Sequence, residues 1–225
     1  MASPATVLFD LDLTLCVSEQ DRDALLSQTF DEVGIEQFCD PADLGAVVPT
    51  LPTAQTELEF YENVFTAAAQ QLDAGEVPAR ALAHAHADLV DHSAVRFREG
   101  AEEALAAARE HADRVGLVTN GGKESQTTKM ESLGIADAFD AAVFVDPRNG
   151  IDPKPAAAPF ERALDALDAD PSETVHVGDS LHSDVAGANA MGIDSVWVPY
   201  DEASELGDHE PTYRLDSVGE LATVL

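Results

Sequence analysis

The chain has few basic residues: 12 Lys and Arg stand against 43 Asp and Glu in 225 residues, which gives a formal net charge of −31. This balance argues against nucleic acid or an anionic membrane as a partner, because clusters of Lys and Arg hold phosphate groups. The acidic residues are spread through periodic segments, which argues against a disordered protein. Repulsion among so many carboxylates opposes folding and is screened by molar salt. We therefore expect a halophilic protein.

Lysine, cysteine and long apolar runs are also scarce. Only Lys123, Lys129 and Lys154 occur, so each lysine is a candidate for a specific role. The two cysteines, Cys16 and Cys39, form no disulfide framework and are typical of a reducing compartment. No apolar run approaches the roughly 20 residues that span a bilayer, and the N-terminus lacks the basic region of a targeting signal. We expect a soluble, cytoplasmic protein.

Short β-type runs alternate with helical patterns over most of the chain. Such strands and helices in alternation predict a parallel sheet that is covered by helices on both faces. The predicted fold class is therefore α/β, with a doubly wound, Rossmann-like core. The five runs lie at residues 6–10, 115–119, 142–145, 174–178 and 195–199.

A long segment of different character separates the first run from the second. Between residues 18 and 96 we find three helical patterns, separated by breaks that contain proline, and we predict no strand there. The apolar stripes of these helices are expected to form a core of their own. We therefore divide the chain into an α/β core domain, residues 1–17 and 97–225, and an inserted all-helical domain, residues 18–96.

Polar residues follow the predicted strands at the point where each one ends or in the next loop. The carboxyl ends of parallel strands meet at one edge of a sheet, where ligands of α/β proteins gather. Residues that are far apart in the sequence are therefore expected to form one site. They are Asp10, Asp12, Thr119, Asn120, Gly121, Lys154, Asp179 and Asp184.

These residue types supply what phosphoryl transfer through an aspartyl intermediate requires. Asp10 is the candidate nucleophile, and Asp12 is the candidate acid toward the leaving oxygen and base toward water. We expect other carboxylates to crowd Asp12. A divalent cation would relieve the repulsion between a carboxylate nucleophile and a phosphate, and loops rich in oxygen suit Mg²⁺. The candidate metal ligands are Asp10, Asp12 through its backbone carbonyl, Asp179 and Asp184.

The remaining polar residues can bind the phosphate. The Thr119 hydroxyl and the Asn120 amide, which we expect to open the next helix, can donate hydrogen bonds to it. Lys154 can offset the carboxylates and stabilise charge that develops during transfer. Arg22, just past the first aspartates, is placed to touch the leaving group, although an exposed ion pair with Glu19 also explains it. The candidate substrate- or phosphate-binding residues are Leu11, Asn120, Gly121 and Arg22.

The order of these motifs, D-x-D-x-T, T-N-G, K-P and G-D-x4-D, resembles the haloacid dehalogenase superfamily of Mg²⁺-dependent phosphohydrolases. The resemblance covers nearly the whole chain, including the helical insert, which lies where that superfamily places its C1-type cap. It implies that Asp10 is the nucleophile and Asp12 the acid and base. Thr119 and Lys154 would stabilise the phosphate group and the charge that develops during its transfer. Leu13 departs from the pattern, since the commonest family residue there is glycine.

Two further residues follow from the resemblance. Asp179 would be the side-chain metal ligand, and Asp184 would bind the metal either directly or through water.

Single residues narrow the choice within that superfamily. The presence of Asp12 disfavours a haloacid dehalogenase, whose pattern lacks the second acid, and no lysine precedes Lys123 to form the Schiff base of a phosphonoacetaldehyde hydrolase. Arg22 and Arg80 are the only Lys or Arg between residues 18 and 95, which disfavours a hexose-phosphate mutase. We expect a phosphatase for a small phosphorylated metabolite, phosphoglycolate-like or nucleotide-like. A mutase or a non-catalytic phosphate-binding member is the alternative.

Overall fold

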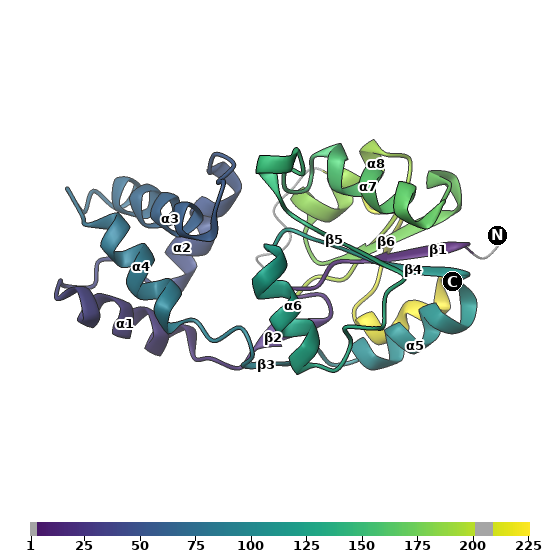
Figure 1. The fold of residues 1–225 in the computed structure, drawn as a ribbon, viewed down its shortest axis with the longest axis horizontal. Coiled ribbons are helices and arrows are strands. Elements are labelled where there is room, and N and C mark those ends of the chain that lie inside the picture. The colour runs from purple at the N-terminus through teal and green to yellow at the C-terminus, as the bar shows by residue number, and fades with distance from the viewer. Residues whose placement is uncertain (1–3, 201–208) are drawn as a thin grey trace. The chain divides into compact units, whose positions relative to one another are not determined.

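A computed structural model describes residues 4–200 and 209–225 of the chain. The chain divides into two compact units, which we describe separately (Figure 1). The first contains the residues up to Ser18 and those from Ser93 onward, and the second is Glu19–His92. Among the described residues, no helix has both the length and the apolar character to cross a membrane.

The first unit is built on a six-stranded sheet with the order β5-β4-β1-β6-β7-β8, in which every neighbouring pair is parallel. The α/β fold class is therefore confirmed. The sequence pattern misses the last strand, because two residues are too few to show a period. The strands are β1 (Thr6–Phe9), β4 (Arg114–Thr119), β5 (Ala141–Phe144), β6 (Thr174–Gly178), β7 (Asp194–Trp197) and β8 (Tyr213–Arg214).

Helices cover both faces of this sheet, with α5 and α6 on one side and α7 and α8 on the other (Figure 1). Successive side chains of β1 therefore enter different cores. Val7 and Phe9 pack in the cluster that contains the buried alanines of α5, whereas Leu8 packs with Phe160 and Leu164 of α7. The helices are α5 (Ala101–His111), α6 (Lys123–Ser132), α7 (Ala157–Leu167) and α8 (Ala186–Ala190).

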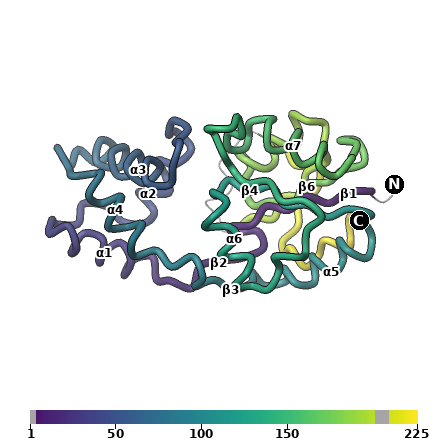
Figure 2. The backbone as a smooth tube through the Cα atoms, viewed as in Figure 1, coloured from purple at the N-terminus to yellow at the C-terminus, as the bar shows by residue number. Residues whose placement is uncertain are grey.

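A short antiparallel ribbon lies where the chain leaves the first unit and returns to it. The strands β2 (Cys16–Ser18) and β3 (Val95–Phe97) pair with Cys16 opposite Phe97, so the two crossing segments run side by side (Figure 2). The expectation that no strand lies between residues 18 and 96 is therefore wrong. Three residues of mixed exposure give no alternation that a sequence pattern could show.

The second unit contains four α-helices among its described residues: α1 (Arg22–Val33), α2 (Pro41–Val47), α3 (Glu57–Gln71) and α4 (Ala79–Leu89). Leu26, Phe30, Phe65 and Leu82 form its core. Helix α2 was missed, because we took Pro41 as a break. Proline instead begins this helix, where its missing N–H costs nothing, and Asp40 caps it.

Candidate active site

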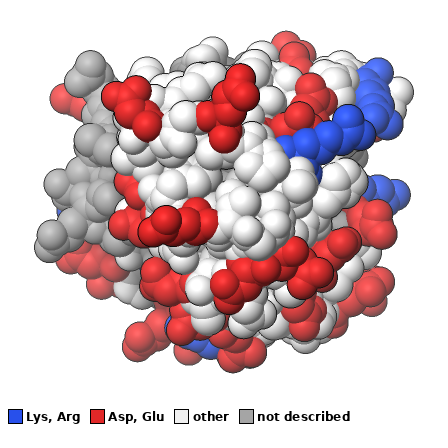
Figure 3. Space-filling model, turned by 90° about the vertical axis from the view of Figure 1, so that its left-hand side faces the viewer, with Lys and Arg blue, Asp and Glu red and all other residues white. Residues whose placement is uncertain are grey.

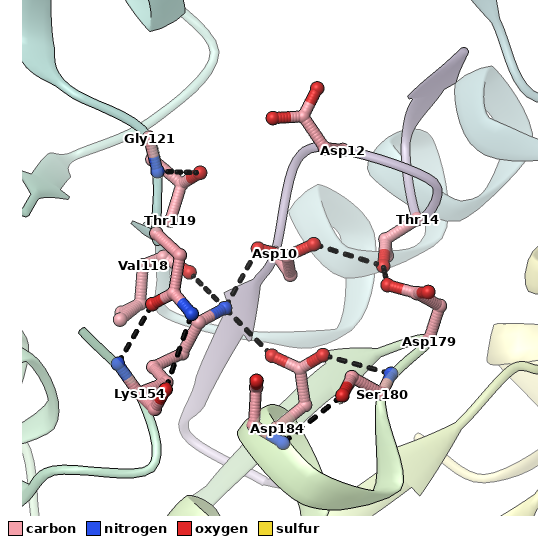
Figure 4. Close-up of polar contacts among 12 residues, drawn as sticks. Asp10, Asp12, Thr14, Val118, Thr119, Gly121, Lys154, Asp179, Ser180 and Asp184 are labelled. Atoms are coloured by element: carbon pink, nitrogen blue, oxygen red, sulfur yellow. Dashed lines mark hydrogen bonds and ion pairs between the residues drawn. The ribbon is translucent and has the colours of Figure 1, made fainter. Parts of the chain in front are cut away.

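The carboxyl ends of three neighbouring strands bring the predicted site residues together (Figure 4). Asp10 directly follows β1, Thr119 ends β4, and Asp179 directly follows β6. The Asp10 backbone N–H donates to the Val177 carbonyl at 2.9 Å, so the loop after β1 continues along β6. Each strand of the central pair, β1 and β6, is therefore followed by an acidic residue.

Lys154 lies at the centre of this group. Its ammonium Nζ lies 2.7 Å from Asp10 Oδ1 and 2.7 Å from Asp184 Oδ1, and it donates to the Val118 carbonyl at 2.7 Å. The side chain is only 1% exposed. Burial alone lowers the pKa of a lysine, but the charges of Asp10 and Asp184 outweigh burial and raise the pKa of Lys154. The lysine is therefore a fixed positive charge.

The carboxyl groups of Asp10 and Asp179 are hard to ionise. Burial, with a further contribution from the charge of Asp184, raises the pKa of Asp10 to about 7 although Lys154 opposes the shift. Burial, together with the charges of Asp184 and Asp10, raises the pKa of Asp179 to about 8. Negative charge is therefore in excess here, and a cation would stabilise the ionised forms.

Three carboxylates have the spacing of a metal site. One oxygen from each of Asp10, Asp179 and Asp184 lies within 4.8 Å of the others. An oxygen-only donor set suits a hard divalent cation such as Mg²⁺. The raised pKa values of Asp10 and Asp179 fit the same interpretation, because burial and neighbouring carboxylates outweigh the opposing charge of Lys154. The residues present therefore fit the ion.

Asp184 lies on a π-helical turn, η4 (Leu181–Val185), and both of its oxygens have partners. Oδ1 pairs with Lys154 and His176, and Oδ2 accepts from the Ser180 backbone N–H at 3.0 Å. Burial would raise the pKa of Asp184, but the charge of Lys154 and the hydrogen bond from His176 hold it below its usual range. Asp184 is therefore ionised when its neighbours Asp10 and Asp179 are still protonated.

Two buried residues of the site had no assigned role in the sequence analysis. The Thr14 hydroxyl lies 3.3 Å from Asp10 Oδ2 and 3.4 Å from Asp179 Oδ1. His176 Nε2 lies 2.9 Å from Asp184 Oδ1, and burial lowers the pKa of His176, so the contact is a hydrogen bond from a neutral ring. Thr14 is the last residue of the D-x-D-x-T motif, whereas the position of His176 inside β6 gave no signal.

Asn120 has a different place from the one expected. Helix α6 begins at Lys123 with Gly122 as its N-cap, so Asn120 does not open the helix. Its side chain instead joins two loops: Oδ1 accepts from the Lys154 backbone N–H at 2.7 Å, and Nδ2 donates to the Lys154 carbonyl at 3.2 Å. Thr119 is buried, and its Oγ1 accepts from the Gly121 backbone N–H at 3.3 Å. Asn120 therefore holds the loop that carries Lys154 against the end of β4.

The direct side-chain partners of Asp12 include a lysine and an amide, whereas the sequence analysis expected carboxylates around it. Its Oδ1 lies 2.7 Å from Lys129 Nζ, and its Oδ2 accepts from Gln126 Nε2 at 2.8 Å. Its side chain is 45% exposed, and among the described residues it lies outside the group of three carboxylates. The partners Gln126 and Lys129 were not assigned to the site from the sequence.

The other candidates are a leucine whose carbonyl accepts backbone hydrogen bonds and an arginine of the second unit. Leu11 is buried, and its carbonyl accepts from the backbone N–H groups of Leu15 and Cys16. Leu13 adopts a φ of 63°, which is the region that favours the glycine common in the family. Arg22 is the first residue of α1 in the helical unit, where it lines a mostly apolar cavity.

The parallel sheet and the acidic site at its carboxyl edge define a Rossmann-like α/β protein. A sequence model described as "Haloacid dehalogenase-like hydrolase" matches residues 7–198, and the chain belongs to this family. The family resemblance that the four motifs indicated is confirmed.

Individual relatives are named phosphatases or hydrolases. The chain is 36% identical over 133 residues to a ribulose-1,5-bisphosphate 5-phosphatase from Halopiger xanaduensis, a match that covers 56% of this chain but only 55% of that enzyme. It is 30% identical to the pyrophosphatase PpaX from Bacillus velezensis, over 96% of this chain and 93% of that protein.

The fold also matches solved structures. The magnesium-bound hydrolase YfnB from Bacillus subtilis superimposes with a TM-score of 0.72 and 20% identity, over 99% of both chains. At this identity the match shows the fold alone.

Proposed function

We propose that this chain is a Mg²⁺-dependent phosphomonoester hydrolase that acts through an aspartyl-phosphate intermediate. The observation that carries the proposal is the contact of Lys154 with both Asp10 and Asp184, beside the carboxylate of Asp179. A carboxylate nucleophile, a fixed cation and a metal-type oxygen set at one sheet edge are the parts that such a transfer needs.

The reaction divides into two steps in which protons balance. An oxygen of Asp10 attacks phosphorus, the bond to the leaving oxygen breaks, and Asp12 gives that oxygen a proton. A water then attacks the acyl phosphate, Asp12 takes its proton, and phosphate leaves as the Asp10 carboxylate is restored. Thr119 and Lys154 would hold the phosphoryl oxygens and offset their charge.

Mg²⁺, when bound, would lower the repulsion between the Asp10 carboxylate and the phosphate. Asp10 and Asp179 are the proposed side-chain ligands, and the Asp12 carbonyl is a third. Both oxygens of Asp184 already have protein partners, which supports a contact through water.

The substrate proposed is a small phosphorylated metabolite, phosphoglycolate-like or nucleotide-like. Relatives support a small phosphorylated compound: the two described above are named for ribulose-1,5-bisphosphate and for pyrophosphate. In the sequence of the helical unit, Arg22 and Arg80 are the only Lys or Arg. A substrate with at most one further anionic group fits this scarcity, and Arg22 is the candidate to bind that group.

The working conditions proposed are those of high salt. On the face seen in Figure 3, acidic side chains are scattered over the surface and basic ones occur in few places. A net charge of −31 repels itself less at high ionic strength. Activity should therefore be assayed in concentrated KCl.

The test is hydrolysis of an aryl phosphate with and without Mg²⁺. Asp10→Asn should lower kcat by a factor of at least about 10³, because the nucleophile is lost. Asp165→Asn, on an exposed position of α7, is the matched control and should leave kcat unchanged. Equal rates for Asp10→Asn and the unaltered protein would refute the proposal, and so would full activity in a chelator. A panel of phosphorylated metabolites then identifies the substrate.

A further inference from the structure

We propose that Gln126 and Lys129 are positioning residues that hold the Asp12 carboxylate for proton transfer, an inference that rests on the function proposed above. Both side chains come from α6, three residues apart, so they lie on one face of the helix. Lys129 Nζ lies 2.7 Å from Asp12 Oδ1, and Gln126 Nε2 donates to Asp12 Oδ2 at 2.8 Å.

Asp12 needs such support because its carboxylate is partly open to solvent, and the further contact from Cys16 Sγ to Oδ1, at 3.9 Å, is long. Its side chain is 45% exposed and follows β1 in a loop, and in Figure 4 it lies apart from the cluster around Lys154. A donor on each oxygen fixes the plane of the carboxylate. An ionised carboxylate offers about four acceptor positions, so both oxygens keep capacity for a proton or a water. A general acid must lie within hydrogen-bond reach of the leaving oxygen.

The burial of Gln126 opposes folding, because one of its polar atoms has no hydrogen-bond partner among the described residues. It is 2% exposed, and its Oε1 is buried without a hydrogen-bond partner in the described part of the chain. A Cβ at position 121 would lie 1.7 Å from Gln126 Nε2, so only glycine leaves room for this side chain. A buried amide oxygen without a partner opposes folding, and its retention points to a role beyond stability.

This contact gives Gly121 of the T-N-G motif a steric role. Its missing side chain admits Gln126, which in turn reaches Asp12.

Lys129 differs from an ordinary surface lysine. It is one of three lysines among 225 residues, and its side chain is only 15% exposed. Lys123, in the first turn of the same helix, is exposed instead. Exposed ion pairs contribute little to stability. The ammonium of Lys129 is mostly buried and pairs with Asp12, so it restrains the position of the Asp12 carboxylate.

The experiment compares two substrates in the full-length protein with Mg²⁺. An aryl phosphate has a good leaving group that needs little protonation, whereas an alkyl phosphate needs the acid. Lys129→Met should lower kcat/KM for the alkyl phosphate by about 10- to 100-fold, a part of what a general acid contributes, and should lower it for the aryl phosphate much less. Gln126→Met should act in the same direction, and Lys129→Arg should restore most of the alkyl phosphate activity.

Lys123→Met is the matched control and should leave both substrates unchanged. Equal losses on both substrates, no loss, or a gain in rate for Lys129→Met and Gln126→Met would each overturn the inference. Thermal unfolding confirms that each variant is folded. An unaltered protein that hydrolyses neither substrate would overturn the proposed function together with this inference. An active protein that is insensitive to the changes in α6 would overturn this inference alone.

Discussion

Replacement of Lys154 by methionine is the strongest perturbation that the site offers. The ammonium group contacts Asp10 and Asp184 at 2.7 Å each and donates to the Val118 carbonyl, and the side chain is 1% exposed. Methionine keeps most of the volume of the lysine stem but removes the charge. Lys154→Met therefore leaves two buried carboxylates and a buried carbonyl without their common partner.

The magnitude follows from the burial. Removal of one partner from a buried ion pair costs about 3–5 kcal/mol, because the remaining charge is uncompensated. In a protein of this size each kcal/mol lowers Tm by about 2–4 °C. We therefore expect Lys154→Met to lower Tm by about 6–20 °C in metal-free buffer near neutral pH. Lys123→Met, at an exposed position, should change the free energy of unfolding by no more than about 0.5 kcal/mol.

The pH dependence gives a second readout. The depressed pKa of Asp184 stabilises the fold above the usual carboxyl value of 3.8, and this contribution is lost as the pH falls through the folded-state pKa. The destabilisation by Lys154→Met should therefore be largest near neutral pH and shrink as the pH falls below 3.8. The double variant Lys154→Met/Asp184→Asn should be more stable than the sum of the single losses predicts, because one unpaired charge is gone.

The assay is thermal and urea unfolding at several pH values in the presence of a chelator. A loss below about 1 kcal/mol near neutral pH would refute the reasoning, because it would mean that the carboxylates do not depend on the lysine. A loss of equal size at all pH values would also refute it, since packing alone would then explain the change.

Two further predictions concern the carboxylates. Burial raises the pKa of Asp10 to about 7 and of Asp179 to about 8, so metal-free stability should fall as the pH rises from 3.8 to about 8. At a fixed concentration, Mg²⁺ should stabilise the protein more at the top of this range, because the ionised ligands bind it more tightly; a concentration of 100 times the Kd corresponds to about 2.7 kcal/mol. A Tm shift independent of pH would contradict this. Gly178→Ala places a Cβ 2.2 Å from Asp184 Cγ and should cost about 1–3 kcal/mol in urea unfolding. Gly122→Ala, with nothing within 4 Å, is its control, and equal losses would contradict the steric reason.

Local sequence patterns predicted most strands of the sheet. The five predicted runs overlap β1, β4, β5, β6 and β7, because buried parallel strands are continuous apolar runs between helical periods. Elements too short for a period were missed, as β8 and the ribbon of β2 with β3 show. Helix α2 was missed because proline at a first helical position looks like a break.

The sequence by itself determined which residues are candidates for the site, because each motif follows a predicted strand and can be recognised from its neighbouring residues alone. It therefore located Asp10, Lys154 and Asp179, which the structure brings to one sheet edge.

Only the tertiary structure decided which side chain meets which. Asp12 pairs with Gln126 and Lys129, which are 114 and 117 residues away, and Asn120 joins the lysine loop rather than opening a helix. Such contacts depend on how α6 packs against the loop after β1. Local hydrophobic periods record which face of an element is buried, but they carry no information on the partner that the face will meet.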